Sequence, residues 1–191
     1  MKKKLAKVIR IISTAPIVAL IFVSTLYLFV PESFQTVWEY LFSVTVLSLL
    51  PLLAYPTQWI FKIDKEDTRA GERKTAIVFS VIGYVVGAVI TFVFNFTDIQ
   101  KIFYLTYLLS GATIAFSSFV LKIKASGHMC GVAGPIAAMV YFGGPGYLGL
   151  TIFLGFVIWS SLYLGRHSPR ELVYGTLIPV GALVLALLIV L

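Results

Sequence analysis

Two histidines, His128 and His167, each lie in a short polar loop between long apolar runs, and the chain has no others. A neutral imidazole titrates near physiological pH. A pair of imidazoles can therefore divide the roles of nucleophile and general acid/base. Each histidine taken alone is also compatible with a structural role at the end of an apolar helix. The residues around the two histidines favour a catalytic role.

Three polar loops, at about 56–74, 122–131 and 160–171, carry basic and hydroxyl side chains. Such side chains can hold a tetrahedral oxyanion together with the amide groups at a helix start, and the guanidinium fork of arginine suits phosphate. Taken alone, the first loop is better explained as a solvated linker whose basic residues follow the positive-inside rule. The candidate phosphate-binding residues in the three loops are Lys62, Arg69, Arg73, Lys124, Ser126, Gly127 and Arg166.

Glu171 follows His167 by four residues, which is one turn of a helix. An imidazole that attacks phosphorus needs its other ring nitrogen held by an acceptor, and Glu171 can provide it. The second imidazole, His128, can protonate the departing oxygen and later activate water. Two histidines without a nearby pair of carboxylates make a poor metal site, so we predict no metal and no other cofactor.

Three spaced patterns contain most of these residues: Lys62-x6-Arg69 followed by Ala70, then Ala125-Ser126-Gly127-His128, then Ser160-Ser161-x5-His167-x3-Glu171. They resemble the three motifs of the type 2 phosphatidic acid phosphatase superfamily, which are Lys-x6-Arg-Pro, Pro-Ser-Gly-His and Ser-Arg-x5-His-x3-Asp. Members of this superfamily are integral-membrane, metal-independent histidine phosphatases. The stronger part of the resemblance covers about residues 125–175.

The resemblance implies that His167 becomes transiently phosphorylated and that His128 is the acid/base. It also implies that Lys62, Arg69, Ser126 and Gly127 hold phosphate. The chain departs from the pattern at Ser161, where the family has an arginine. Either Arg166, beside His167, takes over that role, or the site is weakened by the loss. Ala70 and Ala125 replace prolines, and Glu171 replaces an aspartate with the same charge.

The composition is that of a membrane protein. Of the 191 residues, 59% are apolar and 12% charged, and the mean hydropathy is +0.97, far from the average of soluble proteins. The net charge of +7 makes nucleic acid a candidate partner, but the basic residues cluster at the ends of apolar runs, which is a membrane pattern. We therefore expect a lipid bilayer as partner and no nucleic acid.

The apolar segments predict a single all-α domain over 1–191, a polytopic transmembrane helical bundle with six to seven spans. A crossing needs roughly 20 apolar residues and at least about 17. We expect the short fifth segment to reach that length by starting near Ser126, and the first to be a retained span. The segments are about 11–30, 37–55, 75–96, 101–121, 130–143, 147–165 and 172–191.

The basic residues also predict an orientation. With seven crossings, fourteen of the fifteen lysines and arginines lie on one side, and only Lys101 lies on the other. The positive-inside rule then places the loops with His128 and His167 on the cytoplasmic face of the cell membrane. The five basic residues of 1–10 lie outside every motif, so we expect them to set topology only.

The function that we expect is removal of phosphate from a lipid phosphate or prenyl diphosphate through a phosphohistidine intermediate. A site at the membrane face of helices favours substrates already in the bilayer. Two alternatives remain open. A lipid phosphotransferase would use the same residues, and a non-catalytic lipid-binding or transport protein could have the same fold without the chemistry.

Overall fold

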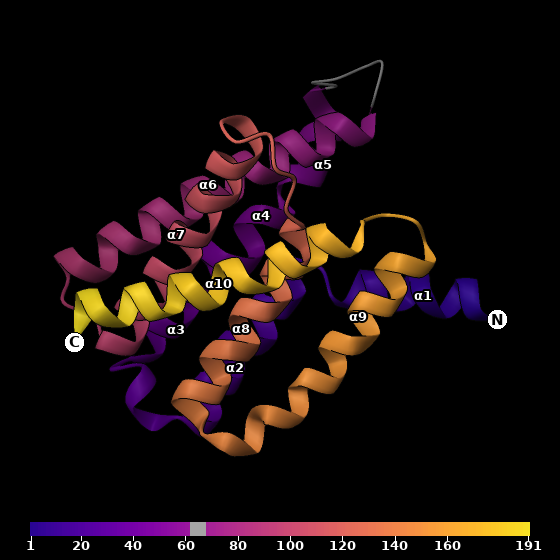
Figure 1. Ribbon diagram of the computed structural model, residues 1–191. Helices are drawn as coiled ribbons and strands as arrows, with labels where there is room; N and C mark the ends of the chain where they lie inside the picture. Colours follow the sequence, from indigo (N-terminus) through magenta and orange to yellow (C-terminus); the bar gives the residue numbers. More distant parts are fainter. Residues whose placement is uncertain (62–67) are drawn as a thin grey trace.

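The computed structural model describes residues 1–61 and 68–191, and these residues form helices joined by short connections (Figure 1). In chain order the elements are α1 (Lys2–Ile12), α2 (Ala15–Phe29), η1 (Pro31–Ser33), α3 (Val37–Val44), η2 (Thr45–Leu49), α4 (Leu50–Leu52), α5 (Ala54–Phe61), α6 (Thr68–Val93), α7 (Asp98–Phe119), α8 (Gly127–Gly143), η3 (Pro145–Leu150), α9 (Thr151–Tyr163) and α10 (Pro169–Val190).

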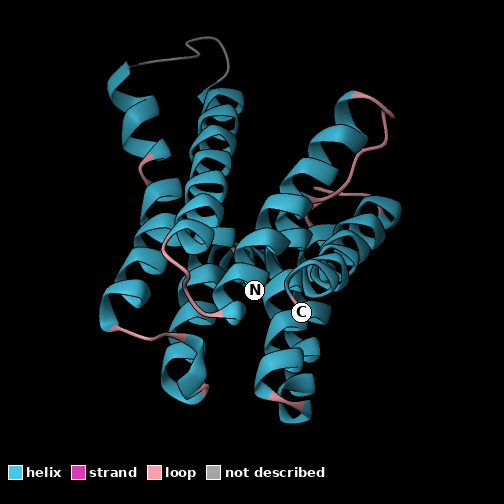
Figure 2. Ribbon diagram, turned by 90° about the vertical axis from the view of Figure 1, so that its left-hand side faces the viewer, coloured by secondary structure: helices cyan, strands magenta, loops and turns pink. Residues whose placement is uncertain are grey.

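The predicted all-α class is confirmed, since no strand occurs in the described part of the chain (Figure 2). Four of the described helices are long and apolar enough to cross a membrane, and a bent pair, α1 with α2, would make a fifth. α8 is not among the four, but it begins directly after Ser126, as predicted, and has 17 residues. The four are Val37–Gln58, Thr75–Val93, Pro145–Tyr163 and Pro169–Val190.

The first apolar segment differs from the prediction of one continuous helix over 11–30. The helix instead begins at Lys2, ends at Ile12, and restarts as α2 with a bend of 57°. Thr14, the residue before α2, has an extended backbone, and Pro16 follows in the first turn. Proline is favoured in the first turn of a helix, whereas in a continuous helix Pro16 would lack the amide that bonds the Ile12 carbonyl and its ring would clash with that carbonyl, which explains the break.

The main apolar core is built where α2 and α7 face each other. Phe22 and Leu26 of α2 are buried with Phe103 and Tyr104 of α7, and the rings of Phe22 and Phe103 meet edge to face at 5.7 Å. The hydroxyl of Tyr104 donates to Ser43 Oγ of α3 at 3.1 Å. This cluster holds the bundle together away from both histidines.

A second apolar cluster lies under the two histidine loops and draws on five helices. Each of the five helices contributes a buried residue, namely Ile9 of α1, Val18 of α2, Met129 of α8, Val157 of α9 and Leu172 of α10. Met129 directly follows His128. The cluster therefore ties the start of α8 to the N-terminal helix and to the start of α10.

Two glycines allow these helices to approach closely. A Cβ on Gly131 of α8 would lie 2.8 Å from the Cβ of Ala15, at the start of α2. A Cβ on Gly175 of α10 would lie 2.5 Å from the backbone oxygen of Ser126 and 2.9 Å from Met129 Cβ. Real Cβ atoms do not approach other atoms so closely, so larger residues there would push α2 or α10 away from the start of α8.

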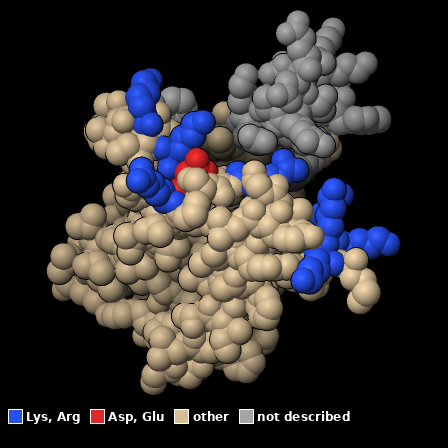
Figure 3. All heavy atoms as spheres, turned by 45° about the vertical axis from the view of Figure 1, so that its right-hand side comes forward, with Lys and Arg blue, Asp and Glu red and all other residues tan. Residues whose placement is uncertain are grey.

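Charged side chains are unevenly distributed between the two ends of the bundle on the face shown in Figure 3. Lysine and arginine side chains gather at one end of that face, with acidic side-chain atoms among them. The rest of that face carries no charged side chain that can be seen. This is the distribution expected of a protein whose apolar belt lies in lipid.

Candidate active site

His167 and Glu171 are brought together by the start of α10. Ser168 caps this helix, and its hydroxyl accepts a hydrogen bond from the Glu171 amide at 3.3 Å. Pro169 follows in the first turn, a position that needs no amide donor. The cap places the Glu171 carboxylate against the residue before Ser168, and its Oε2 lies 2.8 Å from His167 Nδ1.

The His167–Glu171 pair is partly open to its surroundings, with 22% and 24% of the two side chains exposed. A carboxylate at this distance accepts a hydrogen bond from the Nδ1–H group, so the lone pair of the neutral ring is on Nε2. Nε2 is therefore the nitrogen that can act as a nucleophile. The arrangement is the one that the four-residue spacing suggested.

The loop before α8 is joined directly to the same helix start. The Ser126 amide donates to the backbone oxygen of Glu171 at 2.9 Å. The Ser126 hydroxyl in turn caps α8 by accepting from the Met129 amide at 3.2 Å. An added Cβ on Gly127 would meet no atom within 4 Å, so there is room for a ligand at this helix start, where amide groups lack intrahelical partners.

His128 lies in the first turn of α8, and its ring contacts a residue that the sequence had not suggested. Its Nε2 is 2.9 Å from the hydroxyl of Ser13, which is fully buried between α1 and α2. The same hydroxyl donates to the backbone oxygen of Arg10, at 3.4 Å. The N-terminal helix therefore reaches the second histidine of the site.

The electrostatic surroundings keep His128 neutral. Burial lowers the pKa of its imidazole from 6.5 to about 4, with further contributions from the positive charge of Arg10 and from His167. Both effects disfavour the charged ring, the first by removing water and the second by repulsion. The two histidines and Arg10 are therefore close enough to sense one another's charge.

Arg10, one of the basic residues of 1–10 that we expect to set topology, also acts by its charge on His128. Ala6, Ile9 and Ser13 are the buried residues of this stretch, and their spacing marks the inward face of a helix. Arg10 follows Ala6 by four residues and so lies on the edge of that face. That spacing is the signal in the sequence that could have found it.

The remaining predicted residues are distributed as follows. Lys124 and Arg166 have exposed side chains, and the Arg166 amide donates to the backbone oxygen of Ser161 at 3.0 Å. Lys62 lies outside the described residues. Arg69 and Arg73 fall in the first turns of α6, whose backbone is described there but whose side chains are not. Nothing places these three relative to the histidines.

Ser161, where the superfamily has an arginine, is fully buried in α9. Its hydroxyl has no hydrogen-bond partner among the described residues. A guanidinium could not be placed at this position without moving the helices around it. The position that would supply the third-motif arginine is therefore closed in this chain.

No family model, no curated protein and no solved structure matches this chain. The resemblance to the phosphatidic acid phosphatase superfamily therefore rests on the residues themselves. Within the described part of the chain, no group of three or more His, Cys, Asp and Glu side chains is arranged to hold a metal ion.

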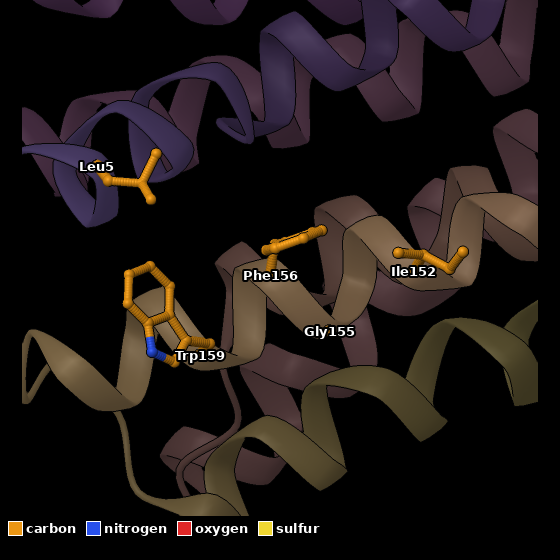
Figure 4. A pocket seen from close by; sticks show the side chains of 5 residues that line it. All are labelled: Leu5, Ile152, Gly155, Phe156 and Trp159. Atoms are coloured by element: carbon orange, nitrogen blue, oxygen red, sulfur yellow. The ribbon is translucent and has the colours of Figure 1, made fainter. Parts of the chain in front are cut away.

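An apolar groove lies between α1 and α9, beside the cluster that supports the histidines (Figure 4). Leu5 of α1 faces Trp159 of α9, and Ile152, Gly155 and Phe156 continue the lining along α9. The groove has a volume of about 460 Å³. Leu5 is one helical turn before Ile9, which is buried with Met129. The groove thus borders the part of α1 that leads to the site.

Proposed function

We propose that the protein is a membrane phosphohydrolase that removes phosphate from a lipid phosphate or prenyl diphosphate. One observation carries the proposal, namely that the Ser126 amide bonds the Glu171 backbone while the Glu171 carboxylate bonds His167. This pair of bonds joins a helix start able to hold phosphate to an oriented imidazole. The neighbouring His128 is the acid/base.

In the first step, Nε2 of His167 attacks phosphorus from the side opposite the leaving oxygen. The bond between phosphorus and the leaving oxygen breaks, its electron pair stays on that oxygen, and His128 donates a proton to it. Glu171 stabilises the positive charge that develops on the His167 ring. The products of this step are the alcohol or the shortened phosphate and a phosphohistidine.

In the second step, neutral His128 takes a proton from water, and the water oxygen attacks the phosphorus of the phosphohistidine. The bond between phosphorus and Nε2 breaks, which releases phosphate and restores His167. His128 must be protonated in the first step, although its pKa is about 4 in the empty site. A bound phosphate supplies negative charge that favours the imidazolium and raises this pKa.

The apolar groove between α1 and α9 supports a lipid as the substrate. Its lining of Leu5, Ile152, Phe156 and Trp159 offers surface to a hydrocarbon chain and no charge to a soluble ester. A chain lying there would place its phosphate toward the end of α1, where Arg10 and Ser13 lie. The chain length and the head group remain open within this class.

We propose further that seven segments cross the bilayer, namely α1 with α2, α3 to α5, α6, α7, α8, η3 with α9, and α10. Because α8 and η3 with α9 both cross, the Ser126 and His167 connections lie on one side, which a shared site requires, and Ser13 lies at the bend of the first segment. The N-terminal basic residues put that side in the cytoplasm of the cell.

The test is phosphate release by the purified full-length protein from a panel of lipid phosphates and prenyl diphosphates, with a chelator present. We expect release from at least one, and His167→Ala should abolish it, because no other residue can form the covalent intermediate. His128→Ala should lower the rate by about 10²–10⁴-fold.

Lys101→Ala is the control, since this residue pairs with Asp98 at 3.0 Å and belongs to no site loop. Wild-type rates in His167→Ala would refute the mechanism. Transfer of the phosphoryl group to an added alcohol instead of water would identify a phosphotransferase. Absence of release and transfer from every substrate would favour the non-catalytic alternative.

A further inference from the structure

The N-terminal helix α1 is held against the site by buried contacts along one of its faces. Ala6 and Ser13 are fully buried and Ile9 nearly so, while the four lysines of this helix are exposed. α1 packs along α9, and Ile9 shares a buried cluster with Met129. The helix is therefore fixed in position next to His128.

Arg10 and Ser13 lie three residues apart on α1 and so project from neighbouring positions on one face. Ser13 reaches His128 Nε2 at 2.9 Å. The Arg10 side chain is partly buried, unlike the exposed Arg166. Its positive charge also contributes, after burial, to the lowered pKa of the His128 ring. Among the arginines whose side chains are described, Arg10 is thus the one tied to the catalytic histidines.

A phosphate held between two imidazoles needs a cation to balance its charge, and a guanidinium matches two of its oxygens at once. The position that would carry this arginine in the superfamily is the buried Ser161. We propose that Arg10 supplies the phosphate-binding guanidinium of this site and that Ser13 positions His128. This proposal rests on the proposed function and extends the site to the N-terminal helix.

The Ser13 hydroxyl has a single hydrogen, and it donates that hydrogen to the Arg10 backbone oxygen. Its oxygen is then the acceptor for a proton on His128 Nε2. This fixes the neutral ring with its lone pair on Nδ1. Nδ1 is therefore the atom that exchanges a proton with the leaving oxygen and with water, and Ser13 acts through the ring without touching the substrate.

The binding test compares Arg10→Ala and Arg10→Lys with Lys7→Ala, which removes an exposed charge from the same helix. Arg10→Ala should weaken inhibition by inorganic phosphate and lower kcat/KM by about 10- to 100-fold, the loss expected for charge-assisted hydrogen bonds. Arg10→Lys should recover part of the loss. Lys7→Ala should leave both values unchanged. Equal effects of Arg10→Ala and Lys7→Ala would overturn the assignment.

A second readout does not depend on turnover. With two histidines in the chain, imidazole NMR signals in detergent can be assigned by comparison with His167→Ala. Among the described residues, the charged or titratable groups that act on His128 are Arg10 on α1 and His167 at the start of α10. His167 is paired with Glu171, whose pKa is also lowered by Lys124 before α8. Arg10→Ala should raise the His128 pKa above about 4, and Lys7→Ala should not.

Ser13→Ala should abolish the preference for a proton on Nε2 of His128 in the same spectra, while the fold is retained. An unchanged tautomer would refute the positioning role. If the wild type hydrolyses no substrate but binds inorganic phosphate through Arg10, the proposed function fails and the anion site stands. If hydrolysis occurs and phosphate binding ignores Arg10, only the present inference fails.

Discussion

At the scale of single residues, the two histidines are held in different electrical environments. His167 is hydrogen-bonded to a carboxylate at 2.8 Å, whereas His128 contacts a neutral hydroxyl at 2.9 Å and senses the positive charge of Arg10. This difference suits the two proposed roles: His167 as a nucleophile that becomes positively charged, and His128 as a base that must also exist in its neutral form. It follows from which residues the fold places beside each ring.

The lowered pKa of His128 predicts a dependence of stability on pH. The unfolded chain takes up a proton on this residue near pH 6.5, but the folded protein does so only near pH 4. The free energy of unfolding should therefore fall as the pH is lowered through this window. Apparent melting temperatures in detergent would show it, and His128→Gln should reduce the slope between pH 6.5 and 4. An identical slope in the variant would contradict the assigned pKa.

At the scale of helices, the site depends on the close approach of α10 to the start of α8. Gly175 faces the backbone of Ser126, so both loops keep their places only while this position has no side chain. The bonds from Ser126 to Glu171 and from Glu171 to His167 depend on the same approach. A small shift of α10 would therefore separate His167 from the start of α8.

Gly175→Ala should accordingly lower both stability and phosphate release. Overpacking of a tight interface typically lowers the free energy of unfolding by about 1–3 kcal/mol. We also expect the rate of phosphate release to fall by at least about 10-fold, because small displacements of catalytic groups lower the rate strongly. Gly181→Ala, in the same helix, is the matched control because its Cβ would meet no atom within 4 Å. Thermal denaturation and phosphate release should be measured on both variants. Equal behaviour of the two variants would argue against the close approach.

At the scale of the whole molecule, the basic residues gather at one end of the described bundle, as one face of it shows (Figure 3). Lys101 differs, since it is paired with Asp98 at 3.0 Å and accompanied by Asn95 at the turn between α6 and α7. The asymmetry that predicts orientation is thus carried mainly by the N-terminal helix and the loops next to the histidines. Arg10 lies on the N-terminal helix and its charge also acts on His128, so it is not independent evidence of topology.

Single cysteines can test the orientation after Cys130, which is buried, is replaced by alanine. We expect a membrane-impermeant thiol reagent applied to intact cells to label Gly146→Cys in η3 but not Ser168→Cys before α10. Both positions are exposed, and a side chain at Gly146 meets no atom within 4 Å. Labelling at Ser168→Cys alone would reverse the orientation and leave the proposed chemistry intact.

The sequence by itself determined the helical class, the start of α8 after Ser126, and the contact between His167 and Glu171. These features depend on local rules: apolar runs, capping residues such as Ser126 and Ser168, and a spacing of four residues. The break at Ser13 and Thr14 was also encoded locally, by Pro16, although the apolar run concealed it.

Only the tertiary structure decided that Ser13 meets His128, which lies 115 positions away in the chain. It likewise decided that the charge of Arg10 reaches His128 and that Ser161 is fully buried. Contacts of this kind depend on how closely helices pack, and here that packing is set by the small residues Gly131 and Gly175. A pattern within one helix specifies which face is buried, but the partner of that face is chosen by the assembled bundle.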